Sequence, residues 1–163
     1  MPLVLSGTSG ISTNGTNWAL QPQSAGYTLQ PNVPCFFAVG NQGAPQSTGQ
    51  VTPFNTALLN NGGYYNSSTY RFTAPVAGIY YFGLYGIMGP NAGGSATSHI
   101  RKNGVIQASM HRNITSDNTW EEGACFLYVS LAVGDYVDTY IGDGTLYLDL
   151  GNRYSGFSGQ LIG

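Results

Sequence analysis

The chain has 163 residues and carries little charge: charged residues make up 7% of it, and the net charge is −2. A chain of this length is able to bury a core of its own. It has no basic cluster that would neutralise a phosphate backbone, which argues against nucleic-acid binding. Frequent Gly and Tyr, and the lack of a long apolar stripe with helical period, indicate strands joined by turns.

Residues 1–33 differ from the rest, since they are rich in Gly, Ser, Thr and Asn with isolated apolar side chains. Such a segment is too apolar for a free linker and too short for its own core. We expect an extended N-terminal arm over 1–33 that attaches to neighbouring subunits or a larger particle, before a body over 34–163. The alternative is a flexible tail. The apolar positions available for attachment are Leu3, Val4, Leu5, Ile11, Trp18 and Leu20.

The first seven residues contain no basic region and only a three-residue apolar run, a pattern that does not predict a signal peptide. No stretch of the sequence is long and apolar enough to cross a membrane. We therefore expect a protein that is made in a cytoplasm and has no membrane partner.

From Pro34 onward the sequence alternates short apolar runs with turn residues. About ten strands and no helix are expected, which predicts an all-β sandwich or jelly roll. The pair Asn103-Gly104 is a strong hairpin signal, because both turn positions favour positive φ. The expected strands are 35–40, 51–59, 64–74, 78–88, 96–102, 105–111, 123–132, 136–142 and 153–162, and the expected long loops are 41–50, 89–95, 113–120 and 143–152.

The expected strand 78–88 is apolar or aromatic on both faces, because its odd and even positions carry mainly Ile, Tyr, Phe, Leu and Gly. A half-exposed strand would have polar residues on one face. One face is expected to meet the second sheet of the sandwich, and the other to meet another copy of the chain. The alternative is a loop of the same chain that covers this face.

Four segments, in the same order along the chain, resemble the motifs of the C1q-like globular domain. They are 65–82 (YNSSTYRFTAPVAGIYYF), 102–104 (KNG), 131–137 (LAVGDYV) and 154–162 (YSGFSGQLI). The resemblance covers about residues 34–163. It implies a ten-stranded jelly roll, related to tumour necrosis factor (TNF), that forms a homotrimer. The aromatic and apolar candidates for the trimer interface are Tyr80, Tyr81, Phe82, Tyr85, Phe126, Tyr128, Phe157 and Leu161.

The opening segment 3–11 (LVLSGTSGI) resembles the starts of short tail-fibre and other virion proteins of bacteriophages. No collagen-like Gly-X-Y stalk precedes the C1q-like segment. The main hypothesis is a trimeric structural protein of a phage virion, a surface knob on a tail-fibre tip or on the head, which binds other virion proteins through the arm. The alternative is a soluble C1q-like lectin or ligand-type module that is not part of a virus.

We expect no enzymatic activity, because no catalytic constellation is visible. The only histidines, His99 and His111, lack an evident second ligand or orienting acid, and Glu121-Glu122 is expected to begin a solvated strand.

The two cysteines, Cys35 and Cys125, each lie in an apolar run and are expected to be buried, unpaired thiols. A disulfide is the alternative, since spacing alone does not decide the pairing.

No cofactor is expected, although carboxylates in the C-terminal third raise the question of calcium, which prefers hard oxygen ligands. Asp135 has a turn role after Gly134, and Asp138 alternates with apolar Val137, so that Asp138 is expected to face solvent. Asp143 and Asp149 are the remaining candidates for a calcium ion.

Antiparallel strands reverse direction, so their connections alternate between the two ends of a sandwich. The turns 75–78, 103–104 and 133–135 are expected at one end, and the loops 89–95, 113–120 and 143–152 at the other. Long loops on a rigid scaffold commonly carry recognition. The loop end would present residues suited to a host-surface glycan or receptor: Asn91, Asn113, Asp117, Asn118, Trp120 and Tyr147.

Overall fold

A computed structural model of the chain describes residues 32–41, 44–89, 94–113 and 120–163, and the backbone of three short strands before them. The chain divides into two compact units, Met1–Val33 and Pro34–Gly163. In the first unit, the expected extended arm contains strand pairing of its own. Its antiparallel sheet consists of β1 (Ile11–Ser12), β2 (Trp18–Pro22) and β3 (Thr28–Leu29), in that order. The attachment candidates Leu3, Val4 and Leu5, and the side chains of Ile11, Trp18 and Leu20, lie outside the described residues.

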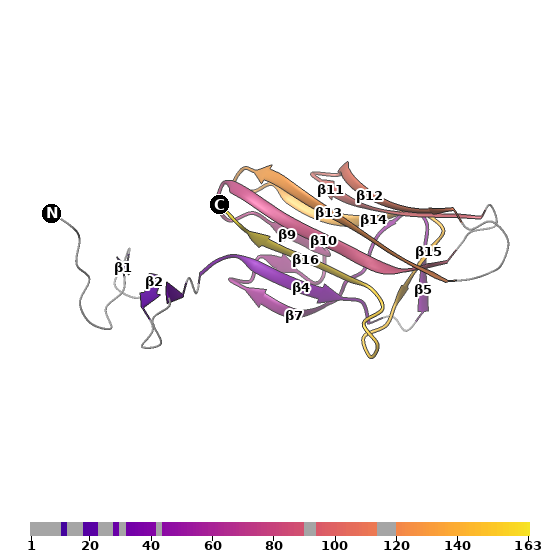
Figure 1. Cartoon of the computed structure of the whole chain (residues 1–163), viewed down its shortest axis with the longest axis horizontal. Helices are drawn as coiled ribbons and strands as arrows, with labels where there is room; N and C mark the ends of the chain where they lie inside the picture. Colours follow the sequence, from indigo (N-terminus) through magenta and orange to yellow (C-terminus); the bar gives the residue numbers. More distant parts are fainter. Residues whose placement is uncertain are drawn as a thin grey trace. The chain divides into compact units, whose positions relative to one another are not determined.

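The second unit, the body, is a sandwich of two antiparallel sheets, as the sequence predicted (Figure 1). Among the described residues it contains no helix, and hence none long and apolar enough to cross a membrane. The first sheet runs in the order β13 (Glu121–Leu131), β10 (Gly78–Gly89), β16 (Gly156–Leu161), β4 (Cys35–Val39) and β7 (Thr56–Asn61). At the end of β10, β15 (Thr145–Leu148) joins this sheet and pairs in turn with β5 (Ala44–Ser47).

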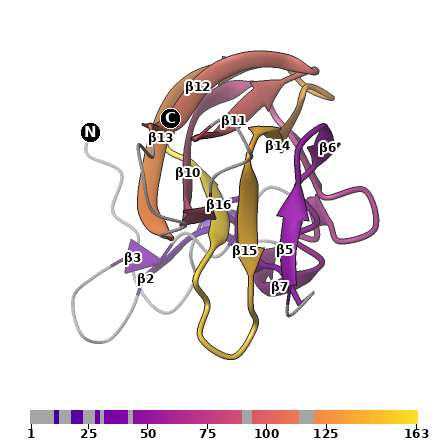
Figure 2. The same ribbon diagram turned by 90° about the vertical axis from the view of Figure 1, so that its right-hand side faces the viewer.

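The second sheet runs in the order β12 (Val105–Asn113), β11 (Ser95–Lys102), β14 (Tyr136–Asp143), β9 (Arg71–Thr73) and β8 (Tyr65–Asn66). A two-residue strand, β6 (Gln50–Val51), also pairs with β14. Figure 2, which views the body from the end of its strands, shows β12 and β13 side by side where the two sheets meet. Strand β13 pairs with β10 on one side, and it therefore forms an edge of the first sheet.

The core between the sheets is built on the even positions of β10, which are fully buried at Tyr80, Phe82 and Leu84. The aromatic ring of Phe36 joins the two sheets, because its centroid lies 5.3 Å from that of Phe72 and 5.0 Å from that of Phe157. Each fully buried side chain of this size contributes roughly 1.5–3 kcal/mol. The core therefore depends on the alternation that the sequence of β10 displays.

Three of the residues predicted at a trimer interface belong to this core instead. Tyr80, Phe82 and Phe157 are each 0% exposed within a single chain, so their assignment to an interface is wrong. Their faces of β10 and β16 meet the second sheet, and no surface of these side chains remains for another subunit. Leu161 is partly buried against the same core.

The turns lie at one end of the body, as predicted from the alternation of connections. The amide of Asn103 donates to the Asp135 carboxylate at 2.7 Å, and the backbone N–H of Ala74 donates to the Asp135 carbonyl at 2.9 Å. These bonds join the turns 103–104 and 133–135 to each other and to Ala74, which immediately precedes the turn 75–78. Asn103 and Gly104 have φ values of 50° and 81°, as the hairpin signal requires.

Several boundaries differ from the sequence prediction, because short pairings form inside segments that are rich in turn residues. The expected loop 41–50 contains β5 and the start of β6, and the expected loop 143–152 contains β15. The expected strand 64–74 divides into β8 and β9 around a turn in which Tyr70 has a φ of 60°. In β15 the apolar positions Leu146 and Leu148 are both buried, with one residue between them.

Asp138 is buried, which corrects the expectation that it faces solvent. It points to the outer face of the second sheet, as its alternation with Val137 predicts, but two arginines cover it. Its carboxylate is 0% exposed and accepts from Arg101 Nε at 2.8 Å and from Arg71 Nε at 3.2 Å. The two guanidinium groups lie over the rings of Tyr136 and Tyr140, 4.2 Å and 4.3 Å from their centroids.

We predict that Asp138→Asn lowers the free energy of unfolding by about 3 kcal/mol, because it leaves two arginines without their shared buried carboxylate. Denaturant unfolding measures this change. The control is Glu122→Gln, an isosteric change at an exposed carboxylate, which is expected to leave the midpoint unaltered. Equal midpoints for both variants would contradict this role for Asp138.

Candidate functional site

Three aromatic side chains form a cluster at the loop end of the body. Trp120 immediately precedes β13, Tyr147 lies on β15, and Tyr154 lies on the connection from β15 to β16. The ring centroids of Trp120 and Tyr147 are 5.5 Å apart, and those of Tyr147 and Tyr154 are 5.6 Å apart. The loops that carry Trp120 and Tyr147 thus lie at the same end, as predicted.

The position of the Trp120 ring depends on a glycine at the end of β10. A Cβ atom added to Gly89 would lie 2.9 Å from the ring atom Cζ3 of Trp120, so only glycine lets the ring pack this closely on the strand. The indole is still 46% exposed, and Tyr154 is 40% exposed. Together with Ile87 and Tyr147 they line a pocket of about 240 Å³, which we call the aromatic pocket.

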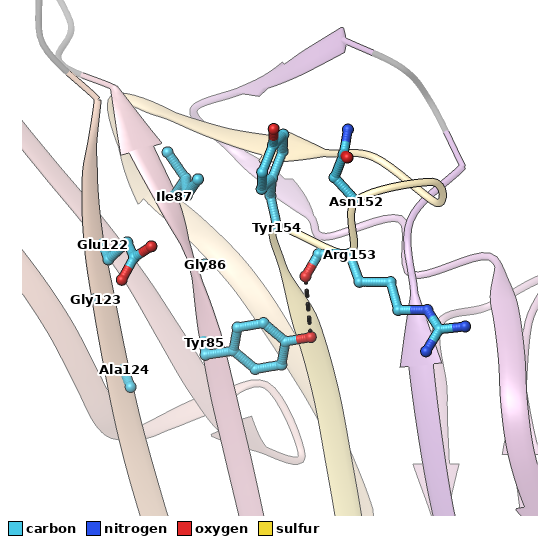
Figure 3. A pocket seen from close by; sticks show the side chains of 9 residues that line it. All are labelled: Tyr85, Gly86, Ile87, Glu122, Gly123, Ala124, Asn152, Arg153 and Tyr154. Carbon is cyan, nitrogen blue, oxygen red and sulfur yellow. Dashed lines mark hydrogen bonds between the residues drawn. The ribbon is translucent and has the colours of Figure 1, made fainter.

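A second pocket of about 520 Å³, the polar pocket, adjoins the aromatic pocket (Figure 3). The two share Ile87 and Tyr154. The polar pocket lies on the outer face of β10 and β13, below the connection between β15 and β16. Its lining comprises Tyr85, Gly86, Ile87, Glu122, Gly123, Ala124, Asn152, Arg153 and Tyr154.

Hydrogen bonds fix the wall of the polar pocket. The hydroxyl of Tyr85 donates to the carbonyl oxygen of Arg153 at 3.1 Å, and burial raises the pKa of Tyr85 above its ordinary value. The side-chain amide of Asn152 donates to Asp149 at 2.8 Å, and the Gly151 N–H donates to the same carboxylate at 2.7 Å. These donors, first of all the Asn152 amide, lower the pKa of Asp149.

The structure brings together only two of the residues predicted at the loop end, Trp120 and Tyr147. Asn91, Asp117 and Asn118 lie outside the described residues, as does the side chain of Asn113 at the end of β12. Sequence reasoning missed Ile87 and Tyr154, because both were expected inside strands, and it assigned Tyr85, which lines the polar pocket, to the trimer interface. The sequence did offer one signal for Tyr154 as a site residue, because this tyrosine follows closely on a segment rich in Gly and Asp, 143–152.

The aspartates considered for calcium have protein partners. Asp143 accepts from the Ser95 hydroxyl and the Gly144 N–H, and Asp149 binds its own turn. Within the described ranges, no group of three or more His, Cys, Asp or Glu side chains is arranged to hold a metal ion.

The other polar candidates also have partners within the chain. His99 Nδ1 lies 2.7 Å from Ser109 Oγ, and burial lowers the pKa of His99. Glu121 forms an ion pair with Arg112. The cysteines are both unpaired, as expected, with Cys125 buried and Cys35 half-buried.

The outer face of the first sheet carries a ridge and a hollow. The ridge consists of Phe126 and Tyr128, which are 61% and 70% exposed on the edge strand β13, and of Tyr81, whose ring stacks on Phe126 at 6.0 Å. The hollow has a volume of about 290 Å³ and lies over β16, β4 and β7. Its outward-facing lining includes Cys35, Phe37, Leu59, Ser158 and Gln160, and Tyr81 forms the border with the ridge.

The model of the C1q domain family matches residues 35–162. Two solved structures similar to this chain are the globular domain of zebrafish complement 1qA, with a TM-score of 0.65 and 21% identity, and Eiger TNF from S. frugiperda, with a TM-score of 0.65 and 9% identity. They cover 80% and 81% of this chain, and 98% and 94% of their own lengths. Murine APRIL at pH 5.0 is similar with a TM-score of 0.62 and 14% identity, over 80% of this chain and 99% of its own. These likenesses show a shared jelly-roll fold.

We predict that Asp135 makes stability depend on pH in the acid range. Bonds from Asn103 and Lys102 lower the pKa of Asp135 from 3.8 to about 2. The folded state therefore favours the ionised form of Asp135. The resulting contribution to the free energy of unfolding is fully present above pH 3.8 and is lost as the pH falls through about 2. Thermal unfolding of the wild type and of Asp135→Asn at several pH values measures it. The difference between the two midpoints is expected to shrink over this window; a constant difference would contradict the assignment.

Proposed function

The chain belongs to the C1q domain family, and on that premise we propose that it is a trimeric, non-enzymatic surface knob of a bacteriophage particle, on a tail-fibre tip or on the head. Domains of the C1q and TNF type are generally binding modules without enzymatic activity. The observation that carries the trimer is the exposed ridge and hollow on the outer face of the first sheet.

The ridge and the hollow support a trimer because they lie on different parts of one face. Phe126 and Tyr128 stand on the edge strand β13, and the hollow lies two to four strands away over β16, β4 and β7. Large adjoining aromatic side chains this exposed typically mark an interaction surface. If the ridge of each subunit enters the hollow of the next, the contact is heterologous, and we propose that it closes into a ring of three.

The attachment to a particle rests on the first unit. Its opening residues resemble the starts of phage virion proteins, and it forms a compact unit separate from the body. We propose that the apolar residues of this unit bind other virion proteins and that the loop end of the body meets the host surface. Ordering such a segment costs conformational entropy, which burial on a partner offsets.

We expect a mass of roughly three chains in light scattering for the wild type, and of one chain for Phe126→Lys, because a charged side chain in the hollow of the next subunit would be buried without a partner. Val105→Lys is the matched control. Val105 is 63% exposed at the start of β12 in the second sheet, and its substitution is expected to leave the trimer intact. A wild type that is monomeric at micromolar concentration would refute the trimer.

Deleting residues 1–30 is expected to leave a folded, trimeric body that no longer joins the particle, because the body has its own core and interface. Electron microscopy of particles that carry a labelled copy measures attachment, and light scattering measures assembly. Dissociation of the truncated body into monomers would make the first unit a trimerisation element instead. Absence of the labelled full chain from particles would favour a free C1q-like binding module.

A further inference from the structure

We propose that the aromatic and polar pockets together bind one neutral hexose unit of a glycan. The role of this binding in host recognition rests on the proposed function, but the site itself lies within one chain and needs neither the trimer nor the particle. Three features carry the assignment: the apolar floor, the hydrogen-bonding character of the rim, and the lack of an acidic side chain beside the aromatic rings among the described residues.

The floor is formed by aromatic rings that the chain holds in place. Gly89 supports the Trp120 ring, Tyr147 packs between the other two rings, and Ile87 fills the base. All four side chains are apolar over the surface that they present, and Trp120 and Tyr154 remain exposed. Such a surface suits the C–H face of a pyranose ring, which packs on aromatic rings without losing hydrogen bonds to water.

The rim offers mainly acceptors, because the guanidinium of Arg153 points away from the Glu122 carboxylate and the Tyr85 ring (Figure 3). The hydroxyl hydrogen of Tyr85 is already donated to Arg153, and the Asn152 amide nitrogen donates to Asp149, so the oxygens of both side chains remain for a ligand. Glu122 adds an exposed carboxylate. In Figure 3 the Glu122 carboxylate and the Tyr85 ring border the same space, with Tyr154 across from them. A ligand that fits this rim supplies donors, as sugar hydroxyls do.

Charge distinguishes a neutral sugar from a cation. Three aromatic rings would also bind a quaternary ammonium group through cation–π attraction if a carboxylate lay beside them. Among the described residues, however, the lining of the aromatic pocket includes no acidic side chain, and the Glu122 carboxylate of the polar pocket lies across that pocket from Tyr154 (Figure 3). The described lining therefore places no carboxylate beside the three rings, which favours a neutral ligand with hydroxyl groups.

The experiment uses the full chain with Trp18→Phe, which leaves Trp120 as the only tryptophan. Its emission is followed while methyl β-glucoside, methyl β-galactoside or N-acetylglucosamine is added. We expect a saturable change with at least one sugar at millimolar concentration. Tyr154→Ala should weaken that affinity about tenfold through loss of ring stacking, and Glu122→Gln, a mild surface change, should weaken it several-fold. Tyr64→Ala, at an exposed tyrosine next to the Asn61 end of β7, should not alter it.

No saturable change with any of the three sugars would overturn the proposal. A saturable change with tetramethylammonium and none with the sugars would overturn it in favour of a cation site. Equal affinities of the wild type, Tyr154→Ala and Glu122→Gln would place the sugar elsewhere. Light scattering on the same samples reports the mass, so that failure of sugar binding is distinguished from failure of the trimer.

Discussion

Strand β10 places one row of side chains in the core and the opposite row on the outer face of the first sheet, and the other features of the body are arranged around this division. The inner row packs on Phe36 and Phe157 and joins the two sheets. The outer row runs from Tyr81 beside the ridge to Tyr85 and Ile87 at the pockets. A shift of one residue in the register of β10 would exchange the two rows and destroy both surfaces.

The two ends of the body are held by different physical means. At the turn end, hydrogen bonds from Asn103, Ala74 and Lys102 converge on Asp135 and lock the turns together. At the loop end, packing dominates: the close approach of Trp120 to Gly89 and the contacts among the three aromatic rings hold the connections. The turn end is thus closed by hydrogen bonds, whereas the loop end leaves aromatic rings exposed to solvent.

The fold and the placement of the two ends could be predicted from the sequence because alternation, turn residues and family motifs all agree there. The identity of the inner face of β10 could not, since both of its faces are apolar and alternation alone does not say which row meets the second sheet. Asp138 could not be placed either, because its cover comes from Arg71 and Arg101 on neighbouring strands. The place of Tyr154 in the site could not be predicted from the sequence, because it depends on the fold, which brings the β15–β16 connection and Trp120 to the same pocket.

The central claim is that other subunits cover the ridge and the hollow on the outer face of the first sheet in solution, while the pockets at the loop end stay open; hydroxyl-radical footprinting of the intact protein tests it most directly. In a single chain Tyr128 is 70% exposed and Tyr64 is 37% exposed, so an unassembled chain would be oxidised faster at Tyr128. Assembly through the ridge and the hollow reverses this order, because it buries Tyr128 and leaves Tyr64 in solvent. Slower oxidation at Tyr128 than at Tyr64 is the predicted result, and faster oxidation at Tyr128 would contradict the account.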